Sequence, residues 1–303
     1  MENKIYSCPG KVFILGEYAC LKGTSALVGT FLPRFELKLL RKKKHEIKIL
    51  IPFHKDSPAG KLLLNNQELL SEYTLQWMDP YKTPIGVGSS SAQFLLSLNA
   101  VRDLKKKKLS SQEDILKEYW HYNPTHIYKP SGCDVMAQLI GGITVIKNEP
   151  LKTKSVPLWR DESSSFLLAF TGEKVKTHEQ LKELYQKGFP HKYAPTLSRL
   201  DNLVLNGISA WERENPELLG KVINQYQQVL HTSLVSTSYH SLIESIQSLP
   251  FVYGCKGSGA QGGDSLLILY KKKEEEKLKD FLKRNKLEIY KIQWSERGFY
   301  SSS

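Results

Sequence analysis

Alternating apolar and polar positions predict β-strands near the start of the chain. Residues 34–40 (RFELKLL) and 46–51 (EIKILI) alternate, as half-buried strands of an antiparallel pair do, and the basic segment 41–45 would connect them. Ahead of them, the apolar run at residues 11–15 (KVFIL) predicts another strand. By contrast, residues 52–83 have weak periodicity and predict no element.

Helical spacing follows a glycine-rich turn at residues 84–88. Leucine and valine recur at every third position from 95 to 104, and Ser89 or Ser90 can cap the N-terminus of this helix. A second helix is expected at residues 111–120, where a serine and an aspartate make a start similar to a capping box.

The polar segment 147–165, which contains two prolines, predicts a boundary between domains of residues 1–155 and 156–303. A strand is expected just before it, at residues 142–146. The second half mixes helices and strands, which is an α+β pattern. Its helices are expected at residues 178–187, 195–214, 216–230, 238–248 and 273–284, and its strands at 166–170, 251–254, 265–270 and 287–293.

The net charge of +12 changes this picture little. It is spread over both halves, +7 in residues 1–150 and +5 in residues 151–303, and its basic runs are short. This distribution disfavours a nucleic-acid-binding protein and suits one with phosphorylated ligands. No apolar run approaches the roughly 20 residues of a membrane span. The start shows no secretory leader, and the four cysteines lack metal-site spacing, so we expect a cytoplasmic protein without a membrane partner.

Residues 84–92 (PIGVGSSSA) carry the strongest chemical signal. Glycines let the backbone approach an anion closely, and a helix N-terminus presents free N–H groups to phosphate. The segment matches neither the Walker loop nor the Rossmann fingerprint. A turn that simply caps a structural helix explains the same residues, and the segment alone does not decide between these two readings.

Three other segments could carry chemistry. They share glycine with a charged residue, and they are 8–16 (CPGKVFILG), 130–134 (PSGCD) and 256–264 (KGSGAQGGD). Each has an ordinary structural explanation: a lysine at a strand edge, an aspartate in a local turn and a flexible hairpin. So many glycines in the last segment nevertheless favour backbone packed against a ligand or another loop.

Taken together and in chain order, the four segments resemble motifs of the GHMP kinases, in particular of the mevalonate and phosphomevalonate kinases. The first stretch, PGKVFILGE, is similar to the motif that opens the chain in that branch, and GVGSSSA to the family's phosphate-binding loop. PSGCD is similar to the segment with the catalytic aspartate, and KGSGAQGGD to the third motif. The resemblance implies an α+β fold with an N-terminal α/β domain like that of ribosomal protein S5 and a ferredoxin-like C-terminal domain.

The resemblance also implies an ATP- and Mg²⁺-dependent kinase that acts on a mevalonate-like acceptor, as a monomer or homodimer. Asp134 would accept the proton of the attacking hydroxyl, with Lys11 beside it, and Ser90 would bind Mg²⁺. The residues implied to bind ATP are Pro84, Gly86, Val87, Gly88, Ser89, Ser90, Ser91 and Ala92. Those implied to bind the acceptor are Glu17, Tyr18, Lys174, Lys176, Thr177, Ser258, Gly259 and Ala260.

Two positions depart from the pattern of mevalonate kinases. Asn123 occupies the place of a glutamate that binds Mg²⁺, and Gln261 interrupts the glycine run of the third motif. Three other functions therefore stay open. They are a nucleotide-binding sensor on the same fold, a decarboxylase of the same superfamily, and a basic nucleic-acid-binding protein.

Overall fold

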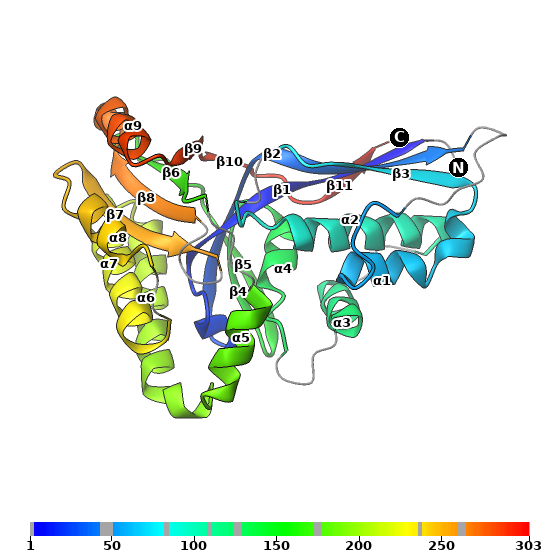
Figure 1. The fold of residues 1–303 in the computed structure, drawn as a ribbon, viewed down its shortest axis with the longest axis horizontal. Coiled ribbons are helices and arrows are strands. Elements are labelled where there is room, and N and C mark those ends of the chain that lie inside the picture. Colours follow the sequence, from blue (N-terminus) through cyan, green and yellow to red (C-terminus); the bar gives the residue numbers. More distant parts are fainter. Residues whose placement is uncertain are drawn as a thin grey trace.

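The computed structural model describes residues 3–42, 51–81, 85–107, 111–123, 129–172, 177–235, 238–259 and 265–302, with the side chains of 177–180 left out. Two antiparallel sheets lie side by side, and helices cover one face of each (Figure 1). No helix in these ranges is long and apolar enough to cross a lipid bilayer.

The first sheet is built on two long strands, β1 (Lys4–Leu15) and β2 (Ala26–Arg41). They pair antiparallel from Lys4 opposite Leu39 to Leu15 opposite Leu27. The sheet order is β11-β1-β2-β4-β5, and β3 and β10 also pair with β2. The other strands are β3 (Tyr73–Met78), β4 (Ile143–Asn148), β5 (Leu151–Val156), β10 (Gln293–Trp294) and β11 (Tyr300–Ser302).

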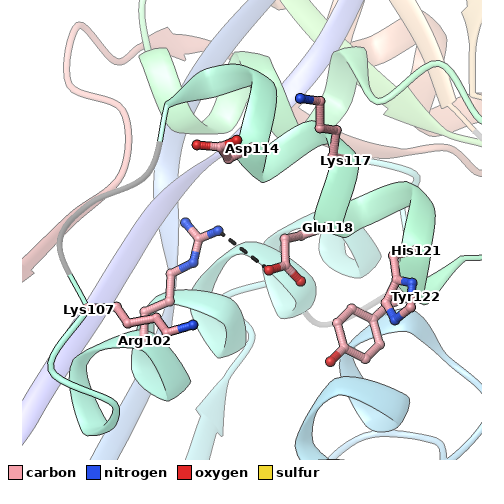
Figure 2. Close-up of a pocket in the computed structure, with 7 residues that line it drawn as sticks. All are labelled: Arg102, Lys107, Asp114, Lys117, Glu118, His121 and Tyr122. Carbon is pink, nitrogen blue, oxygen red and sulfur yellow. Dashed lines mark ion pairs between the residues drawn. The ribbon is translucent and has the colours of Figure 1, made fainter.

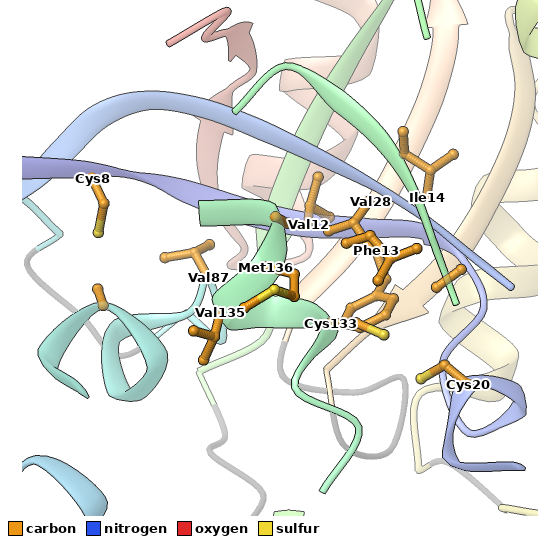
Figure 3. Close-up of a cluster of buried hydrophobic side chains, with 14 of the residues drawn as sticks. Cys8, Val12, Phe13, Ile14, Cys20, Val28, Val87, Cys133, Val135 and Met136 are labelled. Atoms are coloured by element: carbon orange, nitrogen blue, oxygen red, sulfur yellow. The ribbon is translucent and has the colours of Figure 1, made fainter. Parts of the chain in front are cut away.

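Four helices pack near this sheet. The longest, α2 (Ser89–Leu104), is buried along most of its length and runs beneath the strands (Figure 1). Helices α1 (Pro58–Leu64) and α3 (Gln112–Tyr122) begin at serine caps. The short helix α4 (Cys133–Ile140) packs its apolar side chains against β1 and β2, and Figure 3 shows this part of the core. The core thus holds β1, α2 and α4 together.

The second sheet has the order β7-β8-β6-β9. With its helices, the chain follows β-α-β-β-α-β, which is the ferredoxin-like arrangement that the resemblance implied. The strands are β6 (Ser164–Phe170), β7 (Val252–Ser258), β8 (Ser265–Lys271) and β9 (Glu288–Lys291). The helices are α5 (Thr177–Gln186), α6 (Ala194–Glu212), α7 (Pro216–Ser233), α8 (His240–Gln247) and α9 (Glu275–Arg284).

Several sequence predictions need correction. The segment 52–83, which predicted no element, forms α1 and β3. The polar segment 147–165 contains β5, which pairs with β4 through its whole length. The serines Ser89 and Ser90 do not cap α2; Gly88 is the N-cap, and no side chain accepts a hydrogen bond there. The expected strand at 46–51 falls, apart from Ile51, outside the described residues.

The end of the chain returns to the first sheet, which the sequence pattern did not predict. Strands β10 and β11 pair with β2 and β1. Arg34 fixes this return, because its guanidinium donates to the carbonyls of Arg297 (2.8 Å) and Gly298 (2.6 Å) and packs over the ring of Tyr300. Residues 293–302 therefore belong to the same sheet as β1. The limits expected for the domains stay a prediction.

Candidate active site

A glycine-rich loop leads into α2 and leaves its N-terminus open. Gly86 and Gly88 have φ angles of 72° and 91°, which only glycine adopts without strain. A Cβ on Gly88 would meet Cγ of Lys11 at 2.8 Å, so this loop packs directly on that lysine. Because no side chain caps α2, its first N–H groups are free to donate hydrogen bonds to an anion, which the positive end of the helix dipole also attracts.

Lys11 and Asp134 form an ion pair beside this loop. Lys11 lies within β1 and Asp134 in the first turn of α4, and Nζ and Oδ2 are 3.0 Å apart. The lysine side chain is 5% exposed and the aspartate 34%, so the carboxylate faces the open side of the pair. The backbone N–H of Lys11 donates to the carbonyl of Val87 at 2.9 Å, which joins the pair to the glycine-rich loop.

Gln138 holds these three elements together, and the motifs did not reveal it. Its Nε2 donates to the carbonyls of Pro9 (2.9 Å) and Gly88 (3.1 Å), so α4 is tied to both β1 and the loop. Gln138 is fully buried and lies one helical turn after Asp134 on the same face of α4. That spacing of four residues was the available signal for it in the sequence.

A second ion pair, Glu17 with Lys256, lies in the interior between the two sheets. Glu17 follows β1, Lys256 belongs to β7, and both side chains are buried. Burial raises the pKa of Glu17 and lowers that of Lys256, and each charge opposes the shift of the other. Oε2 of Glu17 has no hydrogen-bond partner among the described residues. Glu17 was expected to contact the acceptor; the contact that the structure gives it is Lys256.

The strand that follows the third motif contacts the glycine-rich loop before α2. Ser265, the first residue of β8, donates from Oγ to the carbonyl of Ile85 at 2.6 Å. Ser258 is buried at the end of β7, and Gly259 follows it with a φ of 99°. Ala260 lies outside the described residues. The described ends of this hairpin thus border the same site as Gly88.

Of the remaining residues that were expected at the site, the structure describes some and not others. Tyr18 is buried and adopts a φ of 63° just before a short 3₁₀ helix, Ala19–Lys22. Asn123 is the C-cap of α3. The positions that lie outside the description are Pro84, Lys174, Lys176 and the side chain of Thr177.

The cysteine next to the expected base is a buried structural residue. The Cys133 thiol is fully enclosed, and a hydrogen bond with Cys20, together with burial, raises its pKa well above the ordinary value. A thiol kept protonated in this way is a poor nucleophile.

The described residues contain no group of three or more His, Cys, Asp or Glu side chains that could hold a metal ion, so a magnesium ion here would need phosphate oxygens as further ligands. Ser90 is exposed in the first turn of α2, and the neighbouring Ser89 donates to Oδ2 of Asp79 at 3.0 Å. A hydroxyl and a carboxylate are hard oxygen donors, and Mg²⁺ in phosphoryl-transfer sites commonly uses one or two such groups. Asp79 was missed because it lies in the segment for which no element was predicted.

Comparisons with known proteins decide the fold. Residues 208–288 match the family model described as GHMP kinases C terminal. The chain has the GHMP kinase fold. No curated protein matches the chain by sequence. Among solved structures with this fold, galactokinase from Lactococcus lactis, complexed with galactose, has a TM-score of 0.77 at 13% identity, covering 99% of this chain and 95% of that one.

Two further structures with the GHMP kinase fold are those of a mevalonate kinase and a phosphomevalonate kinase. Mevalonate kinase from Methanococcus jannaschii has a TM-score of 0.69 at 20% identity, covering 95% of this chain and 98% of that one. Phosphomevalonate kinase from Streptococcus pneumoniae has a TM-score of 0.71 at 17% identity, covering 96% and 98%. Because a sugar kinase superposes as well as these two, the fold alone does not separate the branches.

Proposed function

We propose that this protein is an ATP- and Mg²⁺-dependent kinase that phosphorylates a small acceptor of the mevalonate or phosphomevalonate type. The observation that carries the proposal is the Lys11–Asp134 pair, 3.0 Å apart, beside the uncapped N-terminus of α2. A carboxylate next to an ammonium and an anion-binding helix end is the arrangement that phosphoryl transfer needs, since positioning and electrostatics supply most of its catalysis.

In this proposal, the loop around Gly88 and the N–H groups of α2 bind the phosphates of ATP. With a hydroxyl acceptor, Asp134 accepts the hydroxyl proton as the hydroxyl oxygen bonds to the γ-phosphorus and the bond to ADP breaks. A phosphate acceptor attacks instead through an oxygen that is already ionised, and no proton is transferred to Asp134. Lys11 pairs with Asp134 and stabilises negative charge on the attacking oxygen. When bound, Mg²⁺ neutralises charge on the phosphate oxygens, and Ser90 with Asp79 would hold it.

The acceptor is proposed from the motifs, with support from the mevalonate and phosphomevalonate kinases of the same fold. The galactokinase neighbour and a homoserine kinase from Cytophaga hutchinsonii widen the set of acceptors that deserve a test. Lys174, Lys176 and Thr177, which follow β6, are proposed to meet a phosphate or carboxylate of the acceptor.

The test measures ADP release with mevalonate, phosphomevalonate, homoserine and galactose, comparing wild type with Asp134→Asn and Lys11→Met. We expect turnover with one acceptor and a loss of roughly 10²–10⁴-fold in kcat in Asp134→Asn. Asp280→Asn, on the exposed face of α9, is the matched control and should keep full activity. Equal turnover in Asp134→Asn and wild type would refute the proposed role, and phosphorus NMR of the product separates a kinase from a decarboxylase.

A further inference from the structure

A cavity of about 480 Å³ lies between the C-terminal end of α2 and α3 (Figure 2). Its ionisable lining residues are charged groups of both helices and of the turn after α2: Arg102, Lys107, Asp114, Lys117, Glu118 and His121. Arg102 lies in the last turn of α2, thirteen residues from Ser89, which is roughly 20 Å along the helix axis. The cavity is therefore separate from the candidate active site.

The face that α3 turns toward this cavity is charged. Asp114, Lys117, Glu118 and His121 are spaced at i, i+3, i+4 and i+7, which places them on one side of the helix. Asp114, Lys117 and His121 are exposed and Glu118 is half-buried, so the hollow is open to solvent and lined by charge. A polar ligand can therefore reach it.

Arg102 is the most unusual residue of the lining. It is 7% exposed, yet its Nη1 has no hydrogen-bond partner within the described part of the chain. Its ion pair with Glu118 spans 3.9 Å from Nη2 to Oε1, longer than a charge-assisted hydrogen bond of about 2.8 Å. A buried guanidinium nitrogen without an acceptor is destabilising, because its N–H groups have lost water and gained no hydrogen bond in return.

We propose that this cavity is a binding site for a phosphate-bearing anion, with Arg102 as its central ligand. Glu118 is 42% exposed, so its side chain can turn into solvent and leave the guanidinium to a bidentate oxyanion. Once Glu118 has turned away, the lining keeps three positive side chains, those of Arg102, Lys107 and Lys117, and one carboxylate, that of Asp114. The charge of the cavity is then net positive. The site does not depend on the proposed kinase activity.

The test uses pyrophosphate as the probe and lysine acylation, read by mass spectrometry on the full-length protein, as the measurement. We expect pyrophosphate to protect Lys107 and Lys117 from acylation with a single midpoint. The exposed Lys283 on α9 is the control and should react equally at every concentration. Pyrophosphate bound at the phosphate-binding loop would leave Lys107 and Lys117 unprotected, so the two sites are distinguishable.

Two substitutions should shift this midpoint in opposite directions. Arg102→Gln should weaken binding roughly tenfold or more, and Glu118→Gln should tighten it severalfold because the competing carboxylate is gone. Since Arg102 is buried and Arg102→Gln can fail to fold, Glu118→Gln carries the decision. An unchanged or weaker midpoint in Glu118→Gln, or no protection at millimolar pyrophosphate, would overturn the proposal. Equal protection by citrate would overturn the assignment to phosphate.

Discussion

The buried pair of Glu17 and Lys256 should be a sensitive point for stability. Lys256 is fully buried in β7, and its Nζ donates to the Glu17 carboxylate and, at 2.8 Å, to the carbonyl of Gly257. The hydroxyl of Tyr226 on α7 donates to the backbone of Glu17 at 2.7 Å. The pair thus links the end of β1 in one sheet to β7 in the other.

Lys256→Met removes the ammonium and keeps a side chain of similar length. It leaves the Glu17 carboxylate buried without its cation, and breaking a buried pair in this way lowers the free energy of unfolding by about 3–5 kcal/mol. The double substitution Glu17→Gln/Lys256→Met removes both charges and should lose about 2 kcal/mol or less. A larger loss in the free energy of unfolding for the single substitution than for the double one is the signature of an uncompensated buried charge.

The loss should also depend on pH. Burial already raises the pKa of Glu17 in the folded protein, and loss of Lys256 raises it further. Above about pH 4.5, the unfolded chain releases this proton while the folded Lys256→Met variant retains it until the raised pKa is reached. The stability of the variant relative to wild type should therefore fall as the pH rises through that range.

The assay is urea unfolding followed by circular dichroism, at pH 5.5 and pH 8. Lys154→Met is the matched control, because Lys154 pairs with Glu212 at 2.7 Å but with side chains 67% and 38% exposed. An exposed pair of this kind contributes about 0–1 kcal/mol. If Lys256→Met stayed within about 1 kcal/mol of Lys154→Met, the charge-burial argument would be refuted.

Two other substitutions test separate features. Gly88→Ala places a Cβ against Lys11 and Gln138, at 2.8 Å and 3.0 Å from their nearest atoms, so we expect weaker nucleotide binding by calorimetry. Gly172 has a similar φ of 88°, but among the described residues no atom lies within 4 Å of an added Cβ, so Gly172→Ala should lose only the roughly 1 kcal/mol of strain. The second feature is the carboxylate of Glu275. Its burial would raise its pKa, but hydrogen bonds from two lysines and a tyrosine outweigh burial and lower the pKa from 4.5 to about 2. Glu275→Gln should therefore lower the free energy of unfolding by about 2 kcal/mol at pH 7, and the deficit should disappear between pH 4.5 and pH 2 in thermal unfolding scans.

Strong periodicity made most helices of the described ranges predictable, although the short helices α1 and α4 were missed. The expected helices at 111–120 and 195–214 correspond to α3 and α6 within two residues at each end. The segments that failed have weak local signals. Strand β5 (LKTKSV) is a polar edge strand that owes its conformation to pairing with β4, and α1 is a helix of seven residues stabilised by tertiary packing.

The candidate site was predictable only where a motif contains its residue. Lys11 and Asp134 stand in recognisable segments, and the structure brings them together across 123 residues of sequence. Asp79 and Ser265 contact the glycine-rich loop and the first turn of α2 through side-chain hydrogen bonds with Ser89 and with the carbonyl of Ile85. Contacts of this kind depend on the packing of β3 and β8, which no local pattern specifies.

The charges of the candidate site belong to both sheets. Lys11 lies close enough to the buried pair to lower the pKa values of both Glu17 and Lys256, and on its other side it pairs with Asp134. The sign alternates from Lys256 through Glu17 and Lys11 to Asp134, so each charge is stabilised by its neighbours in a region of low dielectric. Removal of Lys256 would leave Glu17 to draw on Lys11, in competition with Asp134. A residue of β7 that has no described hydrogen bond to Lys11 or Asp134 can therefore disturb the proposed catalytic pair, and a lower kcat in Lys256→Met, measured where the variant stays folded, would be its mark.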